Sequence, residues 1–186
     1  MKLEEMKTKT LGLIEELSPN HPKLTEDPDI ATKFNDVANQ VMYELVRIKK
    51  LYKYVEMEVS AGDIVELSDI ASECGYEVFQ VMLFGGVSNT PRAGGTVYKV
   101  HEDGTAEIDV AVYPERITSA TKDSYEFEVS EDVLEIMPYG IAADLLKSDV
   151  SAEYGSIYAT RYESMKQMLD PRYQMQSITF EGGVVV

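Results

Sequence analysis

The spacing of apolar residues changes twice along this chain, and these changes divide it into parts. Residues 3–17 and 30–48 repeat apolar side chains every three or four positions, which predicts two amphipathic helices. Beyond residue 52 the repeat falls to two, as in half-buried strands. Helical spacing returns at residue 130. We therefore predict an α+β fold, in which a bundle of about four helices carries a small antiparallel β domain inserted between its second and third helices.

Helix start and stop signals set the boundaries of these parts. Pro19 and Pro22 end the first helix, and Asp27-Pro28 suits the start of the second. Ser130 and Ser151 are N-cap candidates for the last two helices, of which the first contains Pro138. The predicted parts are a discontinuous bundle of residues 1–51 and 130–172, an inserted β domain of residues 52–129, and a strand-prone C-terminal tail of residues 173–186.

Inside the predicted β domain, alternation and turn residues mark the strands. The longest apolar run, residues 76–84, predicts a strand that is buried on both faces. The glycine-rich residues 85–95 predict a flexible loop, and Asp103-Gly104 predicts a tight hairpin between the strands on either side. The remaining predicted strands are residues 52–59, 64–67, 97–100, 106–112 and 125–129.

The charge of the chain is strongly acidic. Asp and Glu number 33 against 17 Lys and Arg, which gives a formal net charge of -16. Proteins that grip nucleic acid show a basic surface, because their affinity comes largely from phosphate contacts. The acidic balance therefore argues against sequence-specific DNA binding. It is compatible with simple solubility, or with the wall of a channel that conducts DNA without holding it.

Catalytic and targeting signals are weak. The single cysteine, Cys74, excludes a disulfide framework, and no spacing suggests a zinc site. The N-terminus carries acidic residues where a signal peptide needs an apolar run, and no segment has the length and hydropathy of a membrane span. We expect no cofactor, no metal, no membrane association and no enzymatic activity, with a hydrolase that uses paired carboxylates as the remaining catalytic alternative.

Candidate contact residues lie in the glycine-rich segment and in the tail. Arg92 is predicted at the tip of a hairpin, where it can reach a neighbouring subunit or DNA. A β-prone tail can add to the edge of another sheet or dock on its own subunit. The predicted contact residues are Arg92, Tyr173, Ile178, Phe180, Val184, Val185 and Val186.

Three segments also carry a resemblance to a known family. These are residues 11–17, residues 34–40 and, most strongly, residues 134–146, where Met137-Pro138-Tyr139 precedes an alanine-rich helix. In this order of elements the chain resembles the adaptor, or head-tail connector, proteins of tailed phages and prophages. Methionine stands at position 137, where the family has leucine.

The resemblance implies an assembly role. Such proteins form rings, usually described as twelvefold, which bind the portal protein on one side and the next neck or tail component on the other. DNA passes through the lumen. The implied location is the virion, assembled in the host bacterial cytoplasm. Two alternatives stay open: a lower neck or tail-completion ring, and a non-enzymatic protein-binding module that presents a β domain on a helical stalk.

Overall fold

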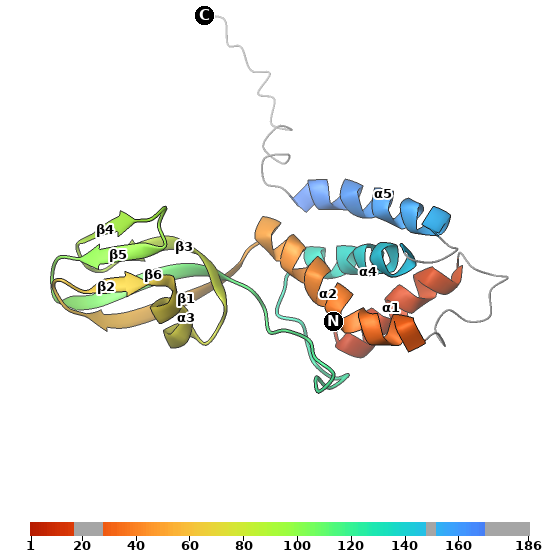
Figure 1. Cartoon of the computed structure of the whole chain (residues 1–186), viewed down its shortest axis with the longest axis horizontal. Helices are drawn as coiled ribbons and strands as arrows, with labels where there is room; N and C mark the ends of the chain where they lie inside the picture. Colours follow the sequence, from red (N-terminus) through yellow and green to blue (C-terminus); the bar gives the residue numbers. More distant parts are fainter. Residues whose placement is uncertain (17–27, 148–151, 170–186) are drawn as a thin grey trace, which may run out of the picture. The chain divides into compact units, whose positions relative to one another are not determined.

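A computed structural model describes residues 1–16, 28–147 and 152–169 (Figure 1). The chain divides into two compact units, residues 1–49 with 117–186 and residues 50–116. The first is the helical unit and the second is the β unit. The described residues form five helices and two small antiparallel sheets, so the mixed helix-and-sheet class predicted from the sequence is confirmed. The observed β unit ends at Arg116, whereas the predicted β domain ended at residue 129.

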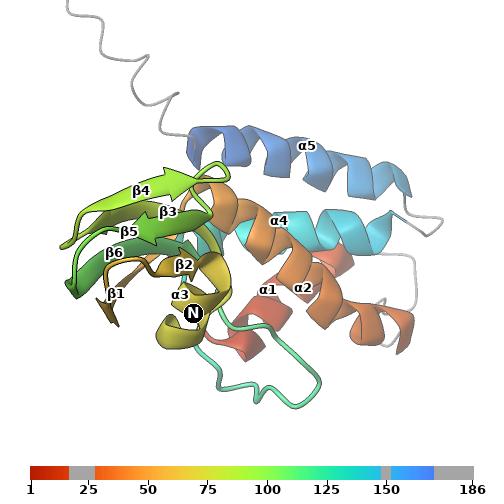
Figure 2. The same ribbon diagram turned by 60° about the vertical axis from the view of Figure 1, so that its left-hand side comes forward.

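The helical unit contains four of the helices. They are α1 (Leu3–Glu16), α2 (Pro28–Ile48), α4 (Glu131–Leu146) and α5 (Ala152–Leu169). Helix α4 packs against each of the other three, and lies between α5 on one side and α1 and α2 on the other (Figures 1 and 2). This central place explains its composition, because eleven of its residues are buried, among them Met137, Pro138 and Ile141. The helix continues through Pro138.

The predicted apolar stripes face the core of this unit. Leu3 and Met6 of α1 and Phe34, Ala38 and Leu45 of α2 are all buried. Helix α2 begins at Pro28, as predicted. The last residue of the first predicted stripe, Leu17, and the proposed cap Ser151 lie outside the described residues.

Residues 117–130 belong to the helical unit and contain no sheet strand, so the predicted strand at residues 125–129 is wrong. This segment pairs with the N-terminus instead, through one bridge between Lys2 and Glu126. The Leu3 amide donates to the Tyr125 carbonyl at 2.9 Å. Further along, the buried side chain of Asn39 exchanges two hydrogen bonds of 2.8 Å with the backbone of Ile117. These bonds fix the point at which the chain returns to the helices.

The β unit consists of two three-stranded sheets and one short helix. Strands β1 (Leu51–Val59), β6 (Gly104–Val112) and β3 (Val78–Gly85) form one sheet in the order β1-β6-β3. Strands β2 (Ile64–Glu66), β5 (Val97–Val100) and β4 (Asn89–Arg92) form the other in the order β2-β5-β4. Both sheets and helix α3 (Leu67–Cys74) contribute to a single core. The stacked rings of Phe84 and Tyr98, 4.4 Å apart, join the two sheets.

Several sequence predictions for this unit are wrong in detail. Helix α3 was not predicted. Asp103-Gly104 does not close a hairpin, because β5 and β6 belong to different sheets. The carboxylate of Asp103 accepts a 2.7 Å hydrogen bond from the amide of Ala61, which ties this turn to the turn after β1. Strand β3 is not buried on both faces, since Leu83 is 57% exposed.

Candidate functional site

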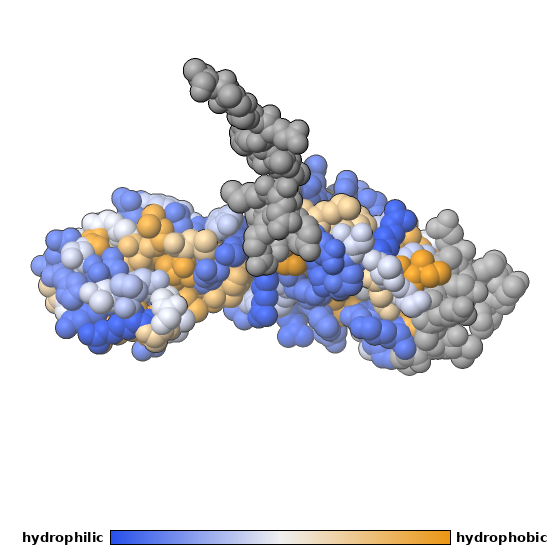
Figure 3. Space-filling model, turned by 90° about the horizontal axis from the view of Figure 1, so that it is seen from above, coloured by the Kyte–Doolittle hydropathy of each residue, from blue (hydrophilic) through white to orange (hydrophobic). Residues whose placement is uncertain are grey.

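No chemical centre is evident in the described part of the chain. Across residues 1–16, 28–147 and 152–169, no three His, Cys, Asp or Glu side chains gather as a metal site would require. None of the described helices is long and apolar enough to cross a membrane. Three surface features remain as candidate sites: a hairpin tip, an open sheet face and a groove between helices. Figure 3 shows that hydrophobic residues reach the surface of both units among hydrophilic ones.

The first feature is the tip of the β4–β5 hairpin, where Arg92 was predicted. Arg92 is the exposed last residue of β4 and pairs with Val97. The segment predicted as a flexible loop therefore contains a strand and an ordered turn. Ala93, Gly94 and Gly95 all have positive φ angles, and the Gly95 amide donates to the Arg92 carbonyl at 2.9 Å. Two glycines in the left-handed region allow this tight reversal, which holds Arg92 at the edge of the second sheet.

The other predicted contact residues belong to the C-terminal tail. Tyr173, Ile178, Phe180 and the three terminal valines lie outside the described residues, so their proposed contacts remain predictions.

Three tyrosines, Tyr154, Tyr158 and Tyr162, are spaced four residues apart along α5. Tyr158 and Tyr162 are buried in the helical unit, while the side chain of Tyr154 lies outside the described set. The two buried tyrosines therefore serve the packing of the helical unit.

The second feature is the outer face of the β1-β6-β3 sheet, which the sequence analysis did not identify. Strand register places its side chains in cross-strand rows. Tyr54 on β1 and Leu83 on β3 both pair with Asp109 on the central strand. Tyr52 lies one row away, opposite Ala111. Tyr52 is 58% exposed and Tyr54 is 56% exposed, so two tyrosines and a leucine form an open apolar surface. We name this surface, with its flanking carboxylates, the tyrosine face.

Carboxylates lie within and beside the tyrosine face, since Asp109 is on the central strand between Tyr54 and Leu83. Glu56 and Glu107 pair across the next row, and the Tyr54 hydroxyl donates a 3.0 Å hydrogen bond to Glu56. That bond, with smaller effects from desolvation and the nearby charges of Glu107 and Asp109, raises the pKa of Tyr54 to about 12. An anionic phenolate is disfavoured there because the local potential is already negative. The part of the face around Tyr54 therefore combines large apolar side chains with negative charge.

The opposite face of the same sheet is filled. Val55, Val59, Ile108 and Val110 point into the core of the β unit. Helix α3 covers this side and contributes the fully buried Ile70. A signal for the tyrosine face was present in the sequence, because Tyr52, Tyr54, Glu56 and Glu58 share one parity along β1. The glutamates indicate that this parity faces solvent, which makes the two tyrosines exposed aromatic residues.

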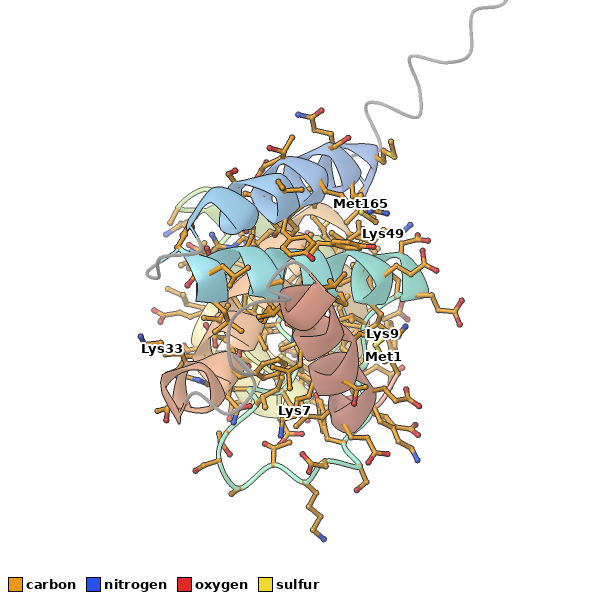
Figure 4. The ribbon with its side chains drawn as sticks, turned by 90° about the vertical axis from the view of Figure 1, so that its right-hand side faces the viewer. Met1, Lys7, Lys9, Lys33, Lys49 and Met165 are labelled. Atoms are coloured by element: carbon orange, nitrogen blue, oxygen red, sulfur yellow. The ribbon has the colours of Figure 1, made fainter. Side chains whose placement is uncertain are left out.

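The third feature is a groove of about 450 Å³ on the helical unit. Its lining comes from α1, α4 and α5, and two lining residues, Lys9 on α1 and Met165 on α5, are labelled in Figure 4. The guanidinium of Arg161 lies 4.5 Å from the centre of the Tyr139 ring, an arrangement that favours cation–π attraction. The other lining residues are Leu13, Glu135 and Pro138.

A polar cluster joins α5 to α2 within the helical unit. The Tyr162 hydroxyl donates to Glu44 at 2.8 Å, and the ammonium of Lys166 lies 2.7 Å from the same carboxylate. Burial alone would raise the pKa of Glu44, but the hydrogen bonds from Lys166 and Tyr162 outweigh it and lower the pKa. Burial and the bond to Glu44 both raise the pKa of Tyr162. The cluster stabilises helix packing and leaves no group poised for proton transfer near pH 7.

Comparison with known proteins does not assign this chain to a family. No protein-family model matches the sequence, and no curated protein is significantly similar to it.

Proposed function

We propose that this chain is a ring-forming head-to-tail connector subunit of a tailed phage or prophage, a structural protein of the virion without a catalytic role. The observation that carries the proposal is the insertion of a compact β unit into the sequence of a helical unit. This is the order of elements on which the resemblance to adaptor proteins rests. In the proposal the helices form the bundle that assembles around the ring and meets the portal protein, and the β unit extends toward the next component.

Two further properties support this role. The net charge of -16 suits a conduit that must let DNA slide, because phosphates are not attracted to carboxylates. A ring also requires two different complementary surfaces on each subunit, since its contacts run head to tail. The groove of α1, α4 and α5, lined by both apolar and charged side chains, offers one open surface for such a contact.

A protein-binding module is the second candidate. The tyrosine face favours it, because exposed tyrosines are enriched at protein interfaces and need no ring to act. A lower neck or tail-completion ring is the third reading, and it differs from the adaptor only in which neighbour the ring contacts.

Sedimentation of the purified chain, alone and with the portal protein from the same genome, separates these functions. The connector proposal predicts a discrete ring-sized species that sediments with the portal. A ring without portal affinity would favour the lower neck position. A monomer that ignores the portal at all concentrations would contradict both ring roles and favour the binding module.

A further inference from the structure

We infer that the tyrosine face binds a cationic surface of a different protein, one that presents arginine or lysine side chains beside apolar ones. The inference uses the geometry of the β1-β6-β3 sheet alone and does not depend on the connector role. Its starting point is the row in which Tyr54, Asp109 and Leu83 lie side by side across three strands.

The apolar part of the face is too exposed and too concentrated to serve packing within the β unit. Tyr52, Tyr54 and Leu83 are each more than half exposed, and Met82, in the irregular register of β3 next to Leu83, is 42% exposed. The side chains that pack the core come from the other face of the same strands. Large apolar side chains grouped on one face mark interaction surfaces, and tyrosine is among the residues that contribute most to binding.

Charge selects the kind of partner. The carboxylates of Glu56, Glu107 and Asp109 surround Tyr54, and Glu58 extends the acidic row along β1. A guanidinium or ammonium group placed over either tyrosine ring would gain cation–π attraction and would face these carboxylates at the same time. The surface therefore matches a partner in which basic side chains lie beside apolar ones.

The same charge argues against a second copy as the occupant. The chain carries a net charge of -16, and a second copy that docked through its own tyrosine face would place like charges against Glu56, Glu107 and Asp109. Like-charge contacts across an interface are costly and select against the wrong partner. We therefore assign the face to a basic protein surface of different sequence.

A titration followed by NMR tests the inference on the full-length, isotope-labelled chain. The probe is a synthetic peptide that alternates arginine with valine, which places cations and apolar side chains on one extended strand. We expect amide shifts that concentrate on β1, β6 and β3, and an affinity that falls as ionic strength rises. Shifts centred on other elements would overturn the inference.

Substitutions and a second peptide make the test specific. Tyr54→Ser and Asp109→Asn should each raise the dissociation constant about tenfold, as expected of residues near the centre of an interface. The matched control is Glu73→Gln, which removes one carboxylate from α3, the helix that covers the other face of the sheet. This control should leave the dissociation constant unchanged.

Two results would contradict the assignment. A peptide that alternates arginine with serine should bind about tenfold more weakly, because the apolar contacts are lost. Equal affinity for the two peptides would mean that binding is only a general attraction between opposite charges, which would contradict the inference. Alternatively, if the chain associates with itself and Tyr54→Ser abolishes that association, then the occupant is a second copy.

Discussion

Gly140 of α4 faces Val41 of α2 and Tyr162 of α5, so replacing it with alanine tests the packing of the helical unit. A Cβ atom added at Gly140 would lie 2.7 and 2.9 Å from two ring carbons of Tyr162, and 2.9 Å from a methyl carbon of Val41. Unstrained carbon contacts are about 3.5–4.0 Å. The ring of Tyr162 cannot easily withdraw, because its hydroxyl is bound to Glu44 at 2.8 Å.

The expected magnitude comes from two opposing effects. Overpacking a well-filled core costs about 1–3 kcal/mol. Alanine in place of glycine within a helix contributes about 1 kcal/mol of stability in the other direction. Gly140→Ala should therefore lower the free energy of unfolding of the helical unit by up to about 2 kcal/mol. Gly12 in α1 is the matched control, because a Cβ there meets nothing within 4 Å. Gly12→Ala should raise the stability by up to about 1 kcal/mol.

Native-state hydrogen exchange of the two variants is the suitable assay. The amides of α2 and α4 report opening of the helical unit separately from opening of the β unit, which matters for a chain with two compact units. Protection of these amides should fall in Gly140→Ala and stay level or rise in Gly12→Ala. If both variants gained the same protection, Gly140 would not be a site of close contact and the described packing of α4 would be refuted.

Three other predictions follow from single contacts. Gly86 has a φ angle of +77°, and an added Cβ would lie 2.3 Å from the Thr105 carbonyl oxygen, so Gly86→Ala should destabilise the β unit by at least about 2 kcal/mol in denaturant unfolding. Tyr162→Phe removes the hydroxyl bound to Glu44 and should lower the stability of the helical unit by about 1 kcal/mol, measured by hydrogen exchange in α5. The lowered pKa of Glu44 means that it contributes stability above pH 4.5, its usual value, and that this contribution is lost as the pH falls through the folded-state pKa. Glu44→Gln should therefore flatten the acid side of the pH–stability curve.

The helices were the most predictable part of the fold, because their signals are local and repeated. The apolar stripes of α1 and α2, the proline at the start of α2 and the cap position of α4 all lie where the sequence indicates. Helix α3 was missed although its ends carry signals. The Glu66 amide bonds to Asp69 in a capping box, and Gly75 ends the helix with a φ angle of +74°. Its short length and its place between two strands hid the pattern.

The strand errors have a common physical cause, which is that pairing depends on residues distant in sequence. Asp103-Gly104 has the composition of a tight hairpin, but Asp103 is held by Ala61 and the flanking strands enter different sheets. Residues 125–129 alternate like a strand, yet they lie in the helical unit and pair with the N-terminus through one bridge at Glu126. Alternation along a segment indicates that one of its faces is buried, but it does not indicate which other segment of the chain covers that face.

The candidate site was only partly predictable. Arg92 was correctly placed near a hairpin tip, where it pairs with Val97. Predicting the tyrosine face required the register of three strands, because Tyr54 and Leu83 share a row only through their common partner Asp109 on β6. Spacing along β1 identifies Tyr52 and Tyr54 as neighbours on one face. It does not identify the residues of β6 and β3 that form the rest of the surface.

Electron microscopy of the purified chain mixed with the portal ring of the same genome is the most direct test of the proposed connector role. The account predicts a ring of this chain docked coaxially on one end of the portal, with the axial channel left open for DNA. Two separate species, a portal ring and free chains, would contradict the adaptor role. The same contradiction would follow from a genome that encodes this chain and no portal protein.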